Sequence, residues 1–164
     1  MMISNAMAAK LNDQVTMEFG ASHKYLAMAC VFDQMGLKIL CRRFLQQTEE
    51  EHGHAMKIVK YLRDVAAPVQ LAAVPQPKAD YKSVGEIVQA ALDSEWAVTR
   101  SINDIVTLAE QEKDYATRSF LEWFVDEQVE EVASMTDLLT LVKLAGPNVL
   151  QVEARVFHEM KEEK

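Results

Sequence analysis

Four long stretches of this chain carry apolar residues at alternating steps of four and three residues. The average period of about 3.5 residues is typical of helices that pack at a shallow angle in a bundle. Near its middle each apolar seam is interrupted by polar side chains, which are Glu18, Glu51 with His54, Glu95, and Gln128 with Glu131. Four carboxylates directed into one core would repel one another and would be costly to desolvate. Because two divalent cations would cancel their four charges, the pattern predicts a buried two-metal site.

The segment between the second and third stretches predicts how the helices connect. It holds Pro68, Pro75 and Pro77, and it is unusually long for a connection in a compact domain. About 16 extended residues reach roughly 50 Å, which is enough to run the length of a helix. The expected fold is all-α, a single domain over residues 1–164. It is a four-helix bundle with a long crossover between helices two and three, plus a short fifth C-terminal helix. The expected bounds are 4–34, 38–66, 83–113 and 115–144 for the bundle, 67–82 for the crossover and 148–160 for the fifth helix.

Local sequence signals and the overall charge add predictions about helix starts, partners and cellular location. Ser83 and Asp114 are the expected N-caps of the third and fourth helices. The net charge of −8 argues against nucleic acid or an anionic membrane as a partner, since both need a basic face. Cys30 and Cys41 form no CxxC pair, so we expect reduced thiols. With no signal peptide and no apolar stretch long enough to span a bilayer, we expect a cytoplasmic protein.

Two of the seam interruptions are pairs at helical spacing. Glu51 and His54 lie three residues apart and therefore share a face, and Gln128 and Glu131 repeat that spacing. A Glu from each of two helices, combined with Glu-x-x-His-type pairs from the other two, is the arrangement of di-iron carboxylate bundles. Oxygen ligands with one imidazole suit Fe, Mn or Zn, and Glu51 is the best candidate to bridge two metals. The alternative is a structural network in which Arg, Lys or Tyr satisfies the buried carboxylates.

Further residues near these interruptions are candidates for secondary roles. Tyr25 lies two turns after Glu18 on the same seam, where it could donate a hydrogen bond or an electron to the metals, or simply pack. A second acidic layer adjoins the first and is either a solvated face or a third, weaker metal position: Glu49, Glu50, Glu127 and Glu130. Trp96 and Trp123 are expected in the core or at its boundary. Five methionines are expected to pack: Met17, Met28, Met35, Met56 and Met135. Three histidines are expected to be exposed: His23, His52 and His158.

At these residues the chain resembles the non-haem bacterial ferritins. The matching segments are residues 11–18, residues 50–54, Glu95 and residues 127–131, and the resemblance covers nearly the whole chain. It implies a hollow homo-oligomeric shell of 24 subunits with a ferroxidase centre in each subunit. Ferrous iron would be oxidised there by dioxygen or peroxide and stored as a ferric mineral.

The resemblance also implies roles for individual residues. The first iron would be held by Glu18, Glu51 and His54. The second would be held by Glu51, Glu95 and Glu131, with Gln128 close by. A third iron position would be formed by Glu50, Glu127, Glu130 and Glu131. Tyr25 would lie beside the centre.

Two positions separate the chain from the haem-containing bacterioferritins. Those proteins have His where this chain has Glu131, and a haem-binding Met where it has His52, so haem is not expected. The acidic threefold pores of animal ferritins have no clear match, because Arg118 stands near Asp114 and Glu122. Two other functions stay open from the sequence. One is a di-metal oxidase or peroxidase without mineral storage, and the other is a non-catalytic bundle whose carboxylates only bind metal.

Overall fold

The computed structural model describes residues 1–162, and this part of the chain contains five helices and no strand. The helices are α1 (Asn5–Gln34), α2 (Lys38–Asp64), α3 (Val84–Glu112), α4 (Tyr115–Ala145) and α5 (Val149–Glu162). The predicted all-α bundle with a short fifth helix is therefore confirmed, with bounds that differ by at most two residues. The predicted single domain runs to residue 164, and its last two residues lie outside the described residues.

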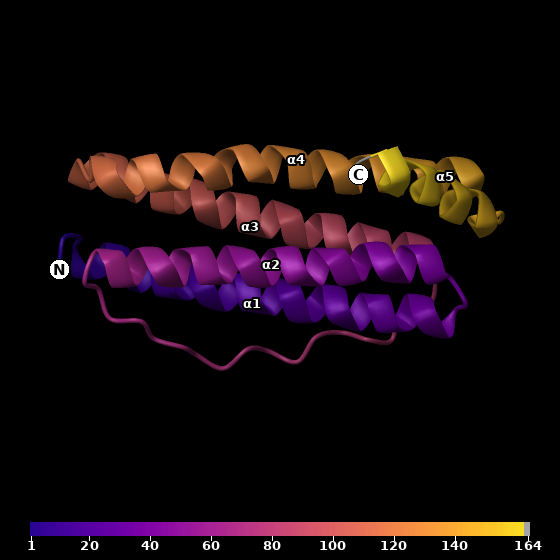
Figure 1. Cartoon of the computed structure of the whole chain (residues 1–164), viewed down its shortest axis with the longest axis horizontal. Helices are drawn as coiled ribbons and strands as arrows, with labels where there is room; N and C mark the ends of the chain where they lie inside the picture. The colour runs from indigo at the N-terminus through magenta and orange to yellow at the C-terminus, as the bar shows by residue number, and fades with distance from the viewer. Residues whose placement is uncertain (163–164) are drawn as a thin grey trace.

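The crossover explains how the two helix pairs are connected. In Figure 1, α1 and α2 form one antiparallel pair, and α3 and α4 form the other. Residues 67–82 contain no helix and run along the outside of the bundle, so that α3 starts at the end where α2 also starts. The side chain of Asn12 fastens this segment to α1. It donates to the carbonyl of Pro68 at 3.0 Å and accepts from the amide of Gln70 at 2.6 Å.

Helix ends are fixed by side chains that the sequence identifies. Ser83 accepts a hydrogen bond from the amide of Glu86 at 3.1 Å, and Asp114 accepts one from the amide of Thr117 at 3.0 Å. Both predicted N-caps are therefore confirmed. Between α1 and α2, Gly36 adopts a φ of +80°, a left-handed conformation that glycine reaches without steric cost.

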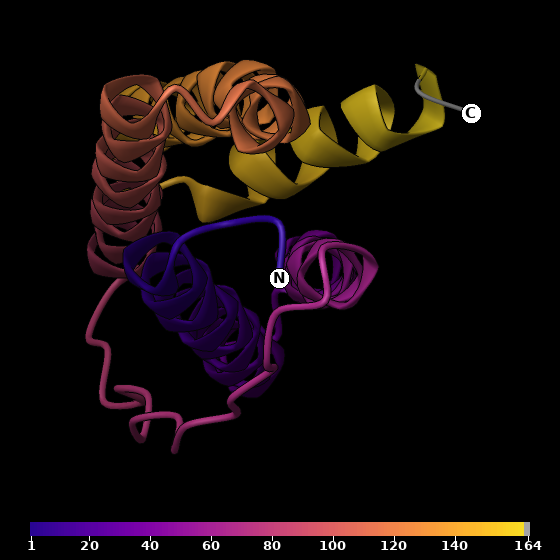
Figure 2. The same cartoon turned by 90° about the vertical axis from the view of Figure 1, so that its left-hand side faces the viewer.

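The N-terminus of α2 is capped from a distant part of the chain. Its own flanking residue, Leu37, makes no side-chain capping bond. Instead the carboxylate of Glu153, on α5, accepts from the amides of Ile39 and Leu40 at 3.2 and 2.7 Å. An anionic group at a helix N-terminus also interacts favourably with the helix dipole. This contact ties α5 to the start of α2, and Figure 2 shows α5 inclined to the four bundle helices.

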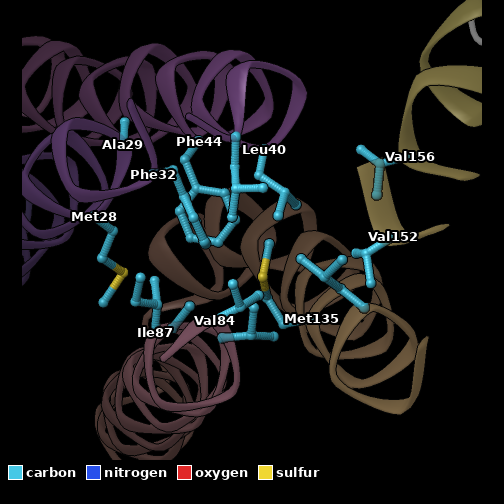
Figure 3. Packing of buried hydrophobic residues seen from close by; sticks show 14 of the residues in the cluster. Met28, Ala29, Phe32, Leu40, Phe44, Val84, Ile87, Met135, Val152 and Val156 are labelled. Atoms are coloured by element: carbon cyan, nitrogen blue, oxygen red, sulfur yellow. The ribbon is translucent and has the colours of Figure 1, made fainter. Parts of the chain in front are cut away.

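Two apolar clusters fill the two halves of the bundle. In one, Phe32 and Phe44 meet edge to face, with centroids 4.8 Å apart, and the buried face of α5 closes the end through Val152 and Val156 (Figure 3). The other cluster is built around Leu11, which belongs to α1, and around side chains of α2, α3 and α4. The polar interruptions of the four seams lie between the clusters. Apolar packing on both sides therefore seals a layer of carboxylates inside the bundle.

Several expectations about the surface need correction. Met28 and Met135 are buried as expected, but three other methionines are substantially exposed: Met17, Met35 and Met56. Trp96 and Trp123 lie at the boundary of the core and not inside it, with exposed fractions of 46% and 38%. Each Trp directly neighbours a buried seam position, and adjacent residues of a helix point about 100° apart. The three histidines expected to be exposed are exposed. None of the described helices is long and apolar enough to cross a membrane.

Candidate metal centre

The residues that interrupt the four seams are brought together inside the bundle. All six are buried, with exposed fractions from 0% to 6%: Glu18 on α1, Glu51 and His54 on α2, Glu95 on α3, and Gln128 and Glu131 on α4. Charged side chains are almost never fully buried unless they are paired or bind a metal. Their convergence therefore requires a compensating interaction for each carboxylate.

One set of three side chains has the geometry of a metal site. Ligand atoms of Glu18, Glu51 and His54 all lie within 4.8 Å of one another, and His54 Nδ1 is 3.4 Å from Glu51 Oε2. Within the described structure, Glu18 Oε2 and Glu51 Oε1 are buried without any hydrogen-bond partner. An unpaired acceptor in a dry interior carries a desolvation cost of about 1–3 kcal/mol, and more when it is charged. A divalent cation between these oxygens would remove that cost, so this donor set fits a metal ion.

The second set expected from the resemblance is less tightly gathered. Glu51, Glu95 and Glu131 are close enough that the charge of Glu95 raises the pKa of both other carboxyls. The second group with ligand atoms within 4.8 Å of one another is instead His54, Glu127 and Glu131. Neutral hydrogen-bond donors engage both Glu95 and Glu131.

These donors form a network around the carboxylates. Tyr25 donates its hydroxyl proton to Glu95 Oε1. Gln128 Nε2 donates to the backbone carbonyl of Glu95 at 3.2 Å, to its Oε2 at 3.4 Å and to Thr99 Oγ1 at 3.1 Å. Gln47 Nε2 donates to Glu131 Oε2 at 2.7 Å. Tyr25 and Gln128, both predicted as part of the site, thus contact one carboxylate, Glu95.

Some hydrogen-bond partners of the buried carboxylates are not predicted by the sequence. Gln14 donates to Glu18 Oε1 at 2.8 Å, and Ser101 in turn donates to Gln14 Oε1 at 2.5 Å. Gln14 is completely buried. A signal was present for Gln47, which is itself a polar residue on the apolar seam of α2. No spacing signal pairs Gln14 with Ser101, because the two residues are 87 positions apart on different helices.

Burial governs the protonation of the buried carboxyls. Desolvation raises the pKa of Glu18, Glu51 and Glu95 above the ordinary value for glutamic acid, with the charge of Glu51 adding to the effect on Glu18. For Glu131, burial and the charge of Glu95 raise the pKa to about 7. Burial also raises the pKa of Tyr25. The metal-free centre therefore holds protons at pH values where exposed glutamates have lost them.

A second, more open acidic site adjoins the centre. A cavity of about 280 Å³ is lined by four carboxylates, namely those of Glu50, Glu127, Glu130 and Glu131. Glu127 Oε1 lies 3.9 Å from His54 Nε2, so the cavity and the centre are in direct contact. Glu49 is exposed and does not line the cavity. Three of the four residues of the predicted second acidic layer are therefore gathered beside the metal centre.

The outer side of His54 is covered by an aromatic residue. The Trp123 ring meets the imidazole edge to face, with centroids 5.3 Å apart. Lys57 Nζ lies 3.4 Å from the centroid of the same indole ring, which is a cation–π contact. Trp123 therefore shields a candidate ligand from solvent, a role that its position beside a seam residue did not reveal.

Chemically, the whole arrangement provides oxygen donors and one imidazole, which suits Fe, Mn or Zn rather than a soft metal. In the buried part, carboxylates from all four bundle helices converge. The open part adds the carboxylate of Glu127, whose Oε1 lies 3.9 Å from His54 Nε2.

Comparisons with known proteins point to one family. The ferritin-like domain family matches residues 8–145. The chain is 42% identical over 132 residues to the bacterial non-heme ferritin of Staphylococcus aureus, covering 80% of each chain. It is 37% identical over 152 residues to ferritin BfrB of Mycolicibacterium smegmatis, covering 93% of this chain and 84% of the relative.

A solved structure extends the likeness to the fold. The open pore ferritin of the archaeon Archaeoglobus fulgidus superimposes with a TM-score of 0.92 at 35% identity, covering 94% of this chain and 96% of that one. Both the extent of the family match and the identity to its relatives show that this chain belongs to the ferritin family.

Proposed function

We propose that this protein oxidises ferrous iron at the buried carboxylate centre and stores the ferric product as a mineral. The observation that carries the proposal is the buried set of Glu18, Glu51 and His54, in which two carboxylate oxygens have no hydrogen-bond partner. Iron is the substrate and cargo here. The names of the relatives, which are ferritins from bacteria and an archaeon, support the same function.

The residues of the centre have distinct roles in this proposal. Glu18, Glu51 and His54 bind one ferrous ion, and Glu51, Glu95 and Glu131 bind a second. Two ferrous ions each give up one electron, and dioxygen takes both electrons and two protons to become hydrogen peroxide. The carboxyls with raised pKa values release their protons when cations bind, because metal binding favours the charged form. The centre thus supplies protons as well as ligands.

Surrounding residues orient the ligands rather than bind iron. Tyr25 holds Glu95 by a hydrogen bond and lies close enough to the centre to donate an electron. Gln128 holds the other oxygen of Glu95, and Gln47 holds Glu131. Such hydrogen-bonded partners fix ligand geometry, and their loss often lowers metal affinity by 10–100-fold. Haem has no part in the proposal.

Storage requires a compartment, and the proposal includes a 24-subunit shell in the cytoplasm. The test is aerobic addition of ferrous iron in amounts far above two ions per chain. We expect ferric iron to stay in solution and to co-migrate with a large assembly in size-exclusion chromatography with light scattering. Precipitation of all iron beyond the first two equivalents would rule out storage.

A second candidate function is a di-metal oxidase or peroxidase acting on an organic substrate without mineral storage. One observation favours it: an apolar groove of about 440 Å³ between α3 and α4 is lined by Thr99 and Gln128, both of which belong to the Glu95 network. A monomer or dimer in solution, together with oxidation of an added organic substrate, would support this candidate over storage.

A further inference from the structure

Arg43 of α2 borders two neighbouring cavities. It lines the acidic cavity and also a second cavity of about 440 Å³ between α4 and α5. Its guanidinium is held in place by a hydrogen bond of 2.7 Å from Nη2 to Ser134 Oγ, and Ser134 lines the same two cavities. Arg43 is half-buried, so its side chain is only partly exposed to solvent.

The charges around the acidic cavity are unequal. Of the nine described residues that line it, four carry carboxylates and Arg43 alone is cationic. A guanidinium keeps its charge at every pH at which the protein folds, so this positive charge is permanent. It partly neutralises the carboxylates when no metal is bound, and it repels any metal cation that enters. The buried centre, in contrast, has no cationic side chain among its six converging residues other than His54 when it is protonated.

We propose that Arg43 is a built-in counter-cation that keeps the acidic cavity's affinity for metal ions low. The inference rests on the proposed function, because it explains how one site can bind iron firmly and its neighbour can bind it reversibly. A weakly bound position beside the oxidation centre suits an ion in transit. Arg43 acts through its charge on the cavity, and Ser134 positions it.

The test is calorimetric titration of the metal-free protein with Zn²⁺, which has suitable ligand chemistry and no redox activity. Arg43→Gln removes the charge and keeps a hydrogen-bond donor for Ser134. We expect the weakest class of Zn²⁺ sites to bind roughly fivefold more tightly, the effect of removing the repulsion between a unit charge and a nearby divalent ion in high-dielectric surroundings. The tighter classes should change by less than about twofold, and the gain should shrink as salt is added.

Three further variants make the result specific. Glu130→Gln should abolish the weakest class and so assign it to the acidic cavity. Arg42→Gln is the matched control, because Arg42 is the adjacent arginine and lies over the Phe157 ring at 5.8 Å instead. Arg43→Lys keeps the charge and should bind Zn²⁺ like the wild type.

Each outcome decides the proposal. An unchanged weak class in Arg43→Gln, or an equal gain in Arg42→Gln, would overturn it, as would an Arg43→Lys variant that behaves like Arg43→Gln. The proposed function is tested by a different measurement, because it is wrong if the wild type oxidises no ferrous iron. The Zn²⁺ titration measures affinity whether or not iron is oxidised.

Discussion

The buried centre and the acidic cavity beside it are both built mainly from glutamates, but the glutamates of the two sites differ in their exposure to water. Glu50 and Glu51 are consecutive, as are Glu130 and Glu131, yet only the second member of each pair is buried. Neighbouring residues of a helix point about 100° apart, so one carboxylate enters the sealed polar layer and the other stays near water. Glu51 is 1% exposed, whereas the Glu127 side chain is 28% exposed. Burial makes uncompensated carboxylates costly in the centre and so favours cation binding there. In the cavity, hydration of the carboxylates weakens this effect.

The largest expected effect comes from removing the buried ligands. Replacing Glu51 and His54 together by Ala should lower the initial rate of iron oxidation by at least about 100-fold, because even the loss of an outer partner costs 10–100-fold in metal affinity. Stopped-flow absorbance of the ferric product measures this rate.

The matched control is the pair Glu49→Ala and His52→Ala. These residues have the same types and the same spacing on the same helix, but both are exposed. The control should oxidise iron at the wild-type rate. Equal losses of oxidation rate in the two double variants would mean that the buried Glu51–His54 pair has no special role compared with the exposed pair.

Protonation gives the next largest effect. Because the pKa of Glu131 is about 7 in the folded protein and about 4.5 in the unfolded chain, the unfolded chain loses its proton first as the pH rises. The free energy of unfolding of the metal-free protein should therefore fall between about pH 4.5 and pH 7. Thermal melts across this range should show a midpoint that drops by several degrees.

Glu131→Gln mimics the protonated acid and should remove the part of this dependence that Glu131 contributes, while Glu18, Glu51 and Glu95, whose pKa values are also raised, keep their parts. Glu130→Gln, at the exposed neighbouring position, should leave the slope unchanged. The explanation based on burial fails if both variants have the wild-type slope, or if both lose it.

Tyr25→Phe is expected to have a smaller effect. It removes the hydroxyl that donates to Glu95, so oxidation should slow by up to about tenfold while the number of bound Zn²⁺ ions stays the same. Tyr61→Phe is the control, since it loses a hydroxyl contact with Thr117 away from the centre. A normal oxidation rate in Tyr25→Phe would limit Tyr25 to packing.

The smallest effect concerns the cavity wall that α5 provides. Glu153→Gln weakens the cap on α2 and should lower the free energy of unfolding by about 1 kcal/mol, as measured by urea titration. Because Met160 of α5 lines the acidic cavity, the Zn²⁺ affinity of the weakest class of sites should change, while the affinities of the tighter classes should not. Glu159→Gln, on the same helix in an exposed ion pair with Arg155, should change neither quantity.

Much of the fold and the centre of the site could be predicted because both depend on local periodicity. The apolar seams predicted four helices, the caps at Ser83 and Asp114 predicted two of the starts, and the prolines predicted the crossover. The six interruptions share one depth because all lie near the middle of antiparallel helices. The sequence was less informative about residues beside the seams, such as Trp96, where a small rotation of a helix decides between core and surface.

What the sequence by itself determined is the set of carboxylates that would meet in the core, since helix geometry alone puts them on the inner faces. Only the tertiary structure decided which neutral donors satisfy them, which glutamates line an open cavity, and that Arg43 and Glu153 reach across to the site and to α2. These contacts join residues up to 114 positions apart. They depend on how each helix is rotated and packed against its neighbours, which no repeat within a single helix encodes.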